Sequence, residues 1–473
     1  MATQRINFAE WLPDQPSISG ALVDVNNVVP LVQGYGSFPS AVNYSNAASE
    51  NLNNVYAGKF STVTQLFAGG ATKLFRFNSG TLNLTDVSKA GGYSGTDRWS
   101  FAQFGDVLLA SNNAEKIQAW TVNSSTAFAD VSATAPIAKY ITVIRDFVVA
   151  ANINNEPNKV QWSDINDETD WTSGGASQSD YQIISDGGNI QGITGGEFGL
   201  VLLERGVIRM SYIGSPLFFQ FDTISRGLGC TDGSTVAQYG QTTYFLSDDG
   251  FYSCDGINLK GIGTEKIDKW FFANCDLSYI STCSTAVDPI RNIVVWNFPN
   301  ISGGRSLLIY NWQTDKWSKA DTDVDYISSV TTSGVTLEDL DAFGLLDDLT
   351  TSLDSRLWVG GKLLFAGVRD NRIVTFTGSN TTGTLTTGDI ELGYNSVMTL
   401  IRPQLENGSA SVSVASRREL DDAITYGSTV AASSEGRCSV RSAGRYHRIS
   451  VTPTGSWIYA IGMDADFKPQ GGR

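Results

Sequence analysis

The residue with the most catalytic potential is His447, the only histidine of the chain, which lies between Tyr446 and Arg448 in an alternating segment. A Ser-His-Asp triad would have to use it as the general base. The sequence contains no Gly-x-Ser-x-Gly elbow to present a nucleophile. A single histidine without paired cysteines also provides too few ligands for a zinc site. We therefore expect His447 to be an outward, solvated side chain on a strand.

Two acidic segments share part of a known site motif. Residues 164–170 carry oxygen ligands at the spacing of a calcium loop, but they lack the sixth-position glycine and the distal glutamate of an EF-hand. Residues 247–250, Ser-Asp-Asp-Gly, are similar to a sialidase Asp-box, but the motif occurs once and lacks its tryptophan. Asp-Gly is also a strong hairpin signal. We predict a hydrogen-bonded surface turn at the first segment and a hairpin turn at the second.

The remaining polar groups single out no reaction. Paired carboxylates for glycoside hydrolysis stay open, because 48 acidic residues offer many pairs. Gly195-Gly196 and the other glycine pairs do not open a helix, so they do not predict a phosphate-binding loop. Arg441, Arg445 and Arg448 could bind an anion, but pairing with acids of a neighbouring module or subunit is the commoner role. We assign no catalytic, cofactor-binding or metal-binding residue and predict that the protein is not an enzyme.

The cysteines and the first residues of the chain indicate the cellular compartment in which the protein is made. Five cysteines, at 230, 254, 275, 283 and 438, are odd in number and form no Cys-x-x-Cys pair. We expect buried free thiols and synthesis in a reducing cytoplasm. The first residues contain no apolar h-region, which predicts no signal peptide. No uninterrupted apolar stretch is long enough to predict a transmembrane helix.

Composition limits the class of protein. The 473 residues include 33 basic and 48 acidic side chains, which gives a net charge of −15. Hydrophobic residues make up 41% of the chain, enough for a large core, so a disordered or collagen-like protein is excluded. The acidic balance and the absence of basic runs argue against a tight grip on nucleic acid.

Hairpins recur along the chain. Residues 105–112, leading to Trp120, are nearly repeated 40 positions later by residues 145–152, leading to Trp162. Each unit is a buried strand, an Asn-rich turn and a second strand. Five looser copies bring the number of predicted hairpins to seven; they lie at residues 66–77, 200–210, 243–252, 293–310 and 363–376.

A repeat of roughly 40–50 residues built from hairpins indicates a β-propeller, in which closing the ring buries faces that one blade cannot bury alone. We therefore predict an all-β fold: an N-terminal arm over 1–50, a β-propeller of about six or seven blades over 51–383, and a C-terminal antiparallel, β-sandwich-like module over 384–473. An ordinary pair of β-sandwiches is the alternative. The wider gap near 310–360 contains a capping box at 336–339 and predicts a short amphipathic helix.

Glycines, tryptophans and turns form a shared pattern in eight segments spread over the chain: residues 10–14, 26–30, 34–36, 99–106, 160–171, 192–216, 353–358 and 444–473. In these segments the chain resembles one protein family, the tail hub, or nozzle, proteins of short-tailed bacteriophages. This family includes the packaged-DNA-stabilisation proteins and, more distantly, tail tubular protein B. The resemblance covers nearly the whole chain, but none of its motifs is catalytic.

The resemblance implies a structural virion protein that forms a ring, usually hexameric, in the phage tail. Such a ring extends the channel of the portal and its adaptor, helps to retain packaged DNA and conducts it during ejection. The implied partners are other copies of the chain, the head-to-tail adaptor, a tail plug or needle, tail fibres or spikes, and passing double-stranded DNA. An acidic chain suits such passage, because like charge prevents tight phosphate binding.

Two other classes of function remain open at this stage. The first is a carbohydrate-binding or carbohydrate-degrading propeller used in host recognition, for which 11 Trp and 17 Tyr could supply sugar platforms. Its discriminating feature would be a pocket with convergent acids and aromatic rings. The second is a cytosolic propeller that scaffolds another complex.

Overall fold

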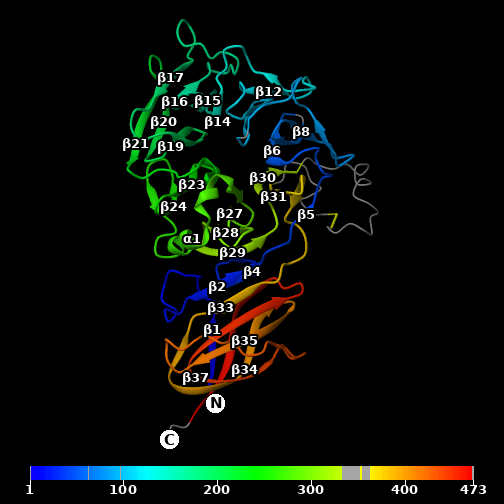
Figure 1. Cartoon of the computed structure of the whole chain (residues 1–473), viewed down its shortest axis with the longest axis vertical. Helices are drawn as coiled ribbons and strands as arrows, with labels where there is room; N and C mark the ends of the chain where they lie inside the picture. Colours follow the sequence, from blue (N-terminus) through cyan, green and yellow to red (C-terminus); the bar gives the residue numbers. More distant parts are fainter. Residues whose placement is uncertain (1, 62, 96, 333–351, 354–362, 471–473) are drawn as a thin grey trace.

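The computed structural model describes residues 2–61, 63–95, 97–332, 352–353 and 363–470. Over these residues the chain is almost entirely β-structure, with one α-helix, α1 (Asp268–Asn274), and two short 3-10 helices, η1 (Gly233–Thr235) and η2 (Leu277–Thr282). A ring of small sheets occupies one end of the long axis and a larger sheet the other (Figure 1). The predicted all-β fold is confirmed.

Seven four-stranded antiparallel sheets form the blades of a β-propeller, numbered here in chain order from the innermost strand outward. Blade 1 consists of β6 (Leu52–Lys59), β7 (Thr64–Gly70), β8 (Leu74–Phe77) and β9 (Leu84–Asp86). Blade 2 consists of β10 (Ser100–Phe104), β11 (Val107–Ser111), β12 (Gln118–Thr121) and β13 (Ala129–Asp130). Blade 3 consists of β14 (Ala138–Ile144), β15 (Phe147–Ile153), β16 (Glu156–Trp162) and β17 (Asp180–Ile183). Blades 4 and 5 are β18 (Ile190–Thr194), β19 (Phe198–Leu203), β20 (Gly206–Gly214) and β21 (Phe218–Arg226); and β22 (Ala237–Tyr239), β23 (Thr242–Ser247), β24 (Gly250–Cys254) and β25 (Leu259–Gly261). Blade 6 is β26 (Ser284–Asp288), β27 (Ile293–Pro299), β28 (Arg305–Asn311) and β29 (Lys316–Thr322), and blade 7 is β30 (Tyr326–Thr331), β31 (Leu363–Arg369), β32 (Arg372–Thr375) and β5 (Val42–Asn43).

Each of the seven predicted hairpins is the pair of middle strands of one blade. In blade 3, for example, β15 and β16 correspond to the predicted unit at 145–162. The middle strands are apolar on both sides because each blade is packed between two neighbours, and β27 is buried along its whole length. The turns use residues that tolerate a left-handed backbone: Asp370 and Asn371, between β31 and β32, have φ of 49° and 61°.

The ring closes through the N-terminal part of the chain. Strand β5 pairs with β32, with Val42 opposite Thr375 and Asn43 opposite Val374. The outermost strand of blade 7 therefore comes from a segment about 280 to 330 residues before the other three in the chain. This pairing fastens the last blade, and it places part of the predicted N-terminal arm inside the propeller.

The C-terminal part of the chain forms a ten-stranded sheet, to which the N-terminal residues also contribute. Its main path runs β2-β33-β37-β34-β38-β4-β3, with β1 beside β38 and with β35 and β36 on the far side of β37. The strands are β1 (Ala2–Asn7), β2 (Leu22–Asn26), β3 (Val28–Pro30), β4 (Tyr35–Ser37), β33 (Thr384–Thr387), β34 (Ile390–Glu406), β35 (Ser409–Arg417), β36 (Val430–Ala431), β37 (Cys438–Thr454) and β38 (Tyr459–Pro469). Residues 1–50, predicted as an arm, thus supply four strands of this sheet and one of blade 7.

The N-terminal segment also joins the sheet to blade 6. The Asn27 amide donates to the Lys319 carbonyl at 2.9 Å, and the Ser318 hydroxyl donates to the Val28 carbonyl at 2.7 Å. Trp11 is fully buried and meets Trp270 of α1 edge to face, with ring centroids 5.0 Å apart. One continuous hydrophobic core contains residues of blades 5 and 6, the N-terminal segment and the large sheet. The propeller and the sheet are therefore packed as one body.

Helix α1 was not expected from the sequence. Its own N-cap, Ile267, makes no side-chain hydrogen bond, and the cap comes instead from Asp14, whose carboxylate accepts the amides of Lys269 and Trp270 at 2.9 and 2.8 Å. The helix predicted at 336–344 lies outside the described residues. Among the described residues, no helix is both long enough and apolar enough to cross a membrane.

Candidate functional site

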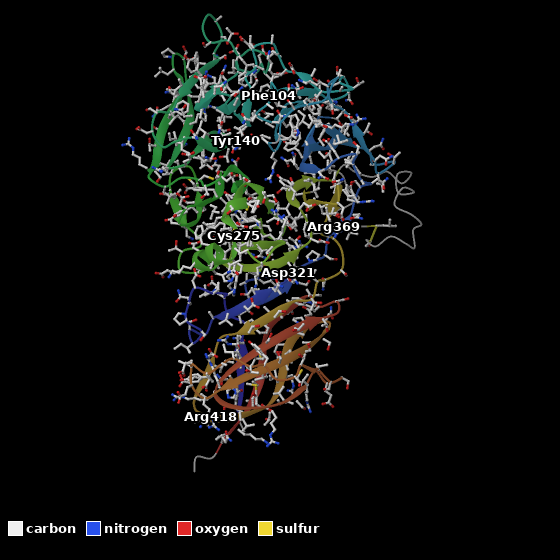
Figure 2. All side chains as sticks on the ribbon, in the orientation of Figure 1. Phe104, Tyr140, Cys275, Asp321, Arg369 and Arg418 are labelled. Carbon is white, nitrogen blue, oxygen red and sulfur yellow. The ribbon has the colours of Figure 1, made fainter. Side chains whose placement is uncertain are left out.

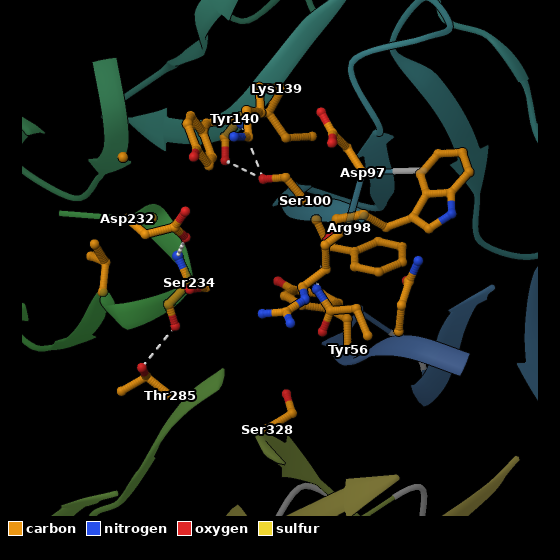
Figure 3. A pocket seen from close by; sticks show the side chains of 18 of the residues that line it. Tyr56, Asp97, Arg98, Ser100, Lys139, Tyr140, Asp232, Ser234, Thr285 and Ser328 are labelled. Carbon is orange, nitrogen blue, oxygen red and sulfur yellow. Dashed lines mark hydrogen bonds between the residues drawn. The ribbon is translucent and has the colours of Figure 1, made fainter. Parts of the chain in front are cut away.

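A cavity of about 630 Å³ lies in the central channel of the propeller and is lined by residues on or just before the innermost strand of every blade. Its size falls within the usual range of small-molecule pockets. The lining is mixed: hydroxyl groups, tyrosines and four charged side chains, Asp97, Arg98, Lys139 and Asp232, face it (Figure 3). Because the innermost strand of a blade is hydrogen-bonded only on its outer side, the channel wall is polar by construction.

Arg98 crosses the channel. It precedes β10 in blade 2, yet its guanidinium donates to the carbonyls of Cys283 and Thr282, just before β26 in blade 6, at 2.5 and 3.3 Å. The same guanidinium lies 4.5 Å from the ring centroid of Tyr326 on β30. Burial raises the pKa of Tyr326, and the positive charge of Arg98 opposes that rise. Arg98 therefore links three blades through neutral partners.

A second guanidinium reaches the same carbonyl. Arg305 donates to the Thr282 carbonyl at 2.7 Å and to the Asn297 side chain at 2.9 Å. Burial lowers the pKa of Arg305, and the nearby charge of Arg98 lowers it further. Two cations thus converge on one backbone oxygen, and the charge of Asp325 acts on Arg305 from nearby.

The two carboxylates of the cavity are held by neutral donors. Asp97 accepts the side-chain amide of Asn113 at 2.9 Å, and Asp232 accepts the amide of Ser234 at 2.8 Å. Asp232 thereby caps η1, which fixes its position. Both carboxylates also lie near Tyr140, whose pKa is raised by burial first and then by these charges. Within the described part of the chain, none of the four charged groups forms an ion pair with another.

The aromatic rings of the channel already have contacts. Tyr326 lies under Arg98, Tyr140 lies 5.4 Å from the Lys139 ammonium, and Tyr56 stacks on Phe101 at 5.6 Å. The tryptophans considered as sugar platforms are mostly core residues: eight are buried, Trp270 and Trp312 are partly buried, and Trp358 lies outside the described residues. The tryptophans are therefore mainly used by the core, whereas several tyrosines, such as Tyr279, are exposed.

The prediction for His447 is wrong. Its side chain is completely buried on β37, with Nε2 2.7 Å from the Ser396 hydroxyl and Nδ1 2.7 Å from the Ser416 hydroxyl. Ser442 donates to Ser416 at 2.6 Å and extends the chain of hydroxyl groups. The alternation placed His447 on a strand correctly, but both faces of this part of the sheet are covered. Burial lowers its pKa to about 4, so the ring is neutral at pH 7.

The acidic segments form turns. In 164–170, Asp164 accepts the amides of Ile165 and Gln178, and Asp167 accepts the amide and hydroxyl of Thr169. The carboxylates therefore stabilise the loop itself, as the predicted surface turn requires. Residues 247–250 form the predicted hairpin turn between β23 and β24. In the described ranges, no three His, Cys, Asp or Glu side chains are grouped closely enough to hold a metal ion.

The arginine cluster separates into local pairs. Arg448 and Arg417 both donate to the buried carboxylate of Asp389, at 2.8 and 2.6 Å, and Arg445 pairs with Glu391 at 2.6 Å. These acids belong to the same sheet rather than to a neighbouring module or subunit. The five cysteines are buried and free, as predicted, and burial raises the pKa of Cys230 to about 12.

The sequence did not single out the channel residues Arg98, Lys139 and Asp232. A partial signal exists: Lys139 lies on β14, the innermost strand that precedes a predicted hairpin, whereas Arg98 and Asp232 lie in the segments just before β10 and β22. These segments can be recognised only after the blades have been assigned, because single Arg and Asp residues are common in turns and do not by themselves indicate a channel.

The fold defines the class of this protein: a seven-bladed β-propeller joined to a ten-stranded sheet. No protein-family model matches the chain. No curated protein matches it either. Among solved structures, it is similar to the computationally designed Ika8 protein (9% identity, 78% of this chain and 99% of that one, TM-score 0.38) and to BamB from Moraxella catarrhalis (9%, 88% and 97%, 0.33). At these identities and TM-scores the likenesses support no functional argument, so the blade topology alone carries the assignment.

Proposed function

We propose that this protein is a structural virion component, a subunit of a ring in the tail of a short-tailed bacteriophage. The proposal rests on the sequence resemblance described above and on one structural observation: the residues of the first resembling segments build the junction between propeller and sheet. Glu10 pairs with Lys266 at 2.9 Å, Trp11 is buried in the common core, and Asp14 caps α1.

This observation supports a structural function because the junction keeps both parts of an elongated subunit in a fixed orientation (Figure 2). A subunit of a closed ring meets each neighbour through two different surfaces, which must keep a constant angle for the ring to close. Exposed apolar side chains lie beside this junction, with Val32 71% and Ile458 51% exposed. These residues are the first candidates for contact between subunits.

The passing genome would follow the lumen enclosed by several subunits. The channel inside one propeller is bridged by Arg98 and has a volume of about 630 Å³, which leaves no room for a DNA duplex. In this proposal the propeller is a rigid building block, and the net charge of −15 keeps DNA from adhering to the ring.

The test is the copy number of the chain in purified virions, measured by quantitative mass spectrometry against the major capsid protein. About six copies per particle would support a hexameric tail ring. A copy number equal to that of tail spikes would indicate a receptor-binding function instead. Absence of the chain from the particle would overturn the proposal.

A further inference from the structure

We propose that the central channel of the propeller is a binding site for a carboxylate-bearing ligand of small-molecule size. This inference does not depend on the tail-ring proposal, because it concerns a cavity within one subunit. The argument rests on the cations of the channel, on what holds them in place and on the space beside them.

The cations lack anionic partners. Within the described residues, no carboxylate lies within 4.0 Å of the nitrogen atoms of Arg98 or Lys139, the two cations that line the cavity. A positive charge held in a partly enclosed site and surrounded by neutral acceptors favours an incoming anion.

The cations are also fixed in position. Arg98 is held by two backbone carbonyls and the Tyr326 ring, and Lys139 lies over the Tyr140 ring. A guanidinium presents five N–H groups in one plane, and two of its nitrogens are already engaged here, so further N–H groups remain for an oxyanion. Because Arg98 is ordered by these three contacts before binding, less conformational entropy is lost when a ligand binds.

The rest of the cavity selects the kind of ligand. Asp97 and Asp232 face the same space, so a large polyanion such as a nucleic acid would meet repulsion as well as attraction. A small ligand with a carboxylate beside Arg98 and a polar donor beside Asp232 fits both signs of charge. Such a carboxylate could belong to a free small acid or to an acidic peptide.

The experiment is isothermal titration calorimetry of the full chain with four probes: glutamate, N-acetyl-Glu-Glu amide, the uncharged N-acetyl-Gln-Gln amide and inorganic phosphate. We expect one site per chain for at least one of the two carboxylate probes and no binding of the glutamine peptide. Binding of glutamate alone would identify a free acid as the source, and binding of the peptide alone would identify an acidic segment. Binding of phosphate alone, or of no probe at millimolar concentration, would overturn the proposal.

Variants locate the site. Lys139→Gln removes a cation that contacts the Tyr140 ring and forms no ion pair within the described residues, and we expect it to weaken binding roughly 10-fold. Arg98→Gln should weaken it by about 10- to 100-fold, and a melting curve shows whether that variant still folds, since Arg98 also links blades. Arg418→Gln is the matched control, because Arg418 is exposed at the far end of the molecule (Figure 2). Equal affinity in wild type and Lys139→Gln would place binding outside the channel, whether or not Arg98→Gln folds.

Discussion

The single histidine allows a pH effect on stability to be assigned to one side chain. In the folded protein, burial lowers the pKa of His447 from 6.5 to about 4. In the unfolded chain the ring is solvated and regains its ordinary pKa. Between these two pH values the unfolded state binds a proton that the folded state excludes. The stability contributed by neutral His447 is therefore fully present above about pH 6.5 and is lost as the pH falls toward 4.

The magnitude follows from the pKa difference. Each pKa unit corresponds to about 1.4 kcal/mol, so the lowered pKa of His447 corresponds to about 3 kcal/mol of stability lost between pH 7 and pH 4. Burial explains why the folded state resists protonation: the ring is completely buried, and a hydrogen bond with the Gly444 backbone opposes the lowered pKa only in part. Among the described residues, no carboxylate lies within 4.0 Å of the imidazole. A charged ring would be buried without a counter-ion.

The assay compares wild type with His447→Gln by urea denaturation at several pH values from 7.5 to 4.5, followed by tryptophan fluorescence. The His447→Gln substitution itself changes the free energy of unfolding at pH 7.5, and this difference is subtracted as a baseline. Wild type should then lose more stability than the variant as the pH falls, and the difference should approach about 2–3 kcal/mol at the lowest pH. The NMR signal of the single imidazole gives a direct check. An imidazole that titrates near pH 6.5 in the folded protein would refute the reasoning.

Four further perturbations test other parts of the structure. Asp14→Ala removes the cap of α1 and should cost about 1 kcal/mol in urea denaturation, whereas Asp14→Asn should cost less because it keeps an acceptor. Asp389→Ala leaves Arg417 and Arg448 buried without a counter-charge and should lower the free energy of unfolding by about 3–5 kcal/mol. A loss below about 1 kcal/mol would show that these two arginines are solvated. Deleting residues 1–50 should give a chain that is degraded rapidly by protease, because five strands are lost, whereas a stable propeller would restore the interpretation of this segment as an arm. The five cysteines should not react with Ellman's reagent until guanidinium unfolds the chain, in keeping with the raised pKa of Cys230; fast native reaction of any of them would contradict the burial.

The propeller was predictable because its information is local. Each blade contains a hairpin whose strands are apolar on both faces and whose turn uses Asn, Asp or Gly, so seven copies of that pattern are visible in the chain. The near-repeat of residues 105–112 at 145–152 corresponds to β11 and β15, the second strands of two adjacent blades. The buried, unpaired cysteines follow from the same kind of local argument.

The N-terminal segment was not predictable in this way. Its strands are short, and apart from the β3–β4 hairpin their partners lie hundreds of residues away: β5 pairs with β32, and β1 pairs with β38. Nothing in the pattern of a two- or six-residue strand specifies a partner at such a distance. The same limit applies to α1, whose cap is supplied by Asp14 from another part of the chain.

The sequence by itself determined the all-β class, the seven hairpins, the position of His447 on a strand and the absence of any complete catalytic motif, because each depends on residue type and short-range order. Only the tertiary structure decided which side chains share a space. It buried His447 among three serines, separated the arginines into local pairs, and brought Arg98, Lys139 and Asp232 from three blades to one channel. The physical reason is that ring closure fixes long-range neighbours through packing and strand pairing, which no local pattern records.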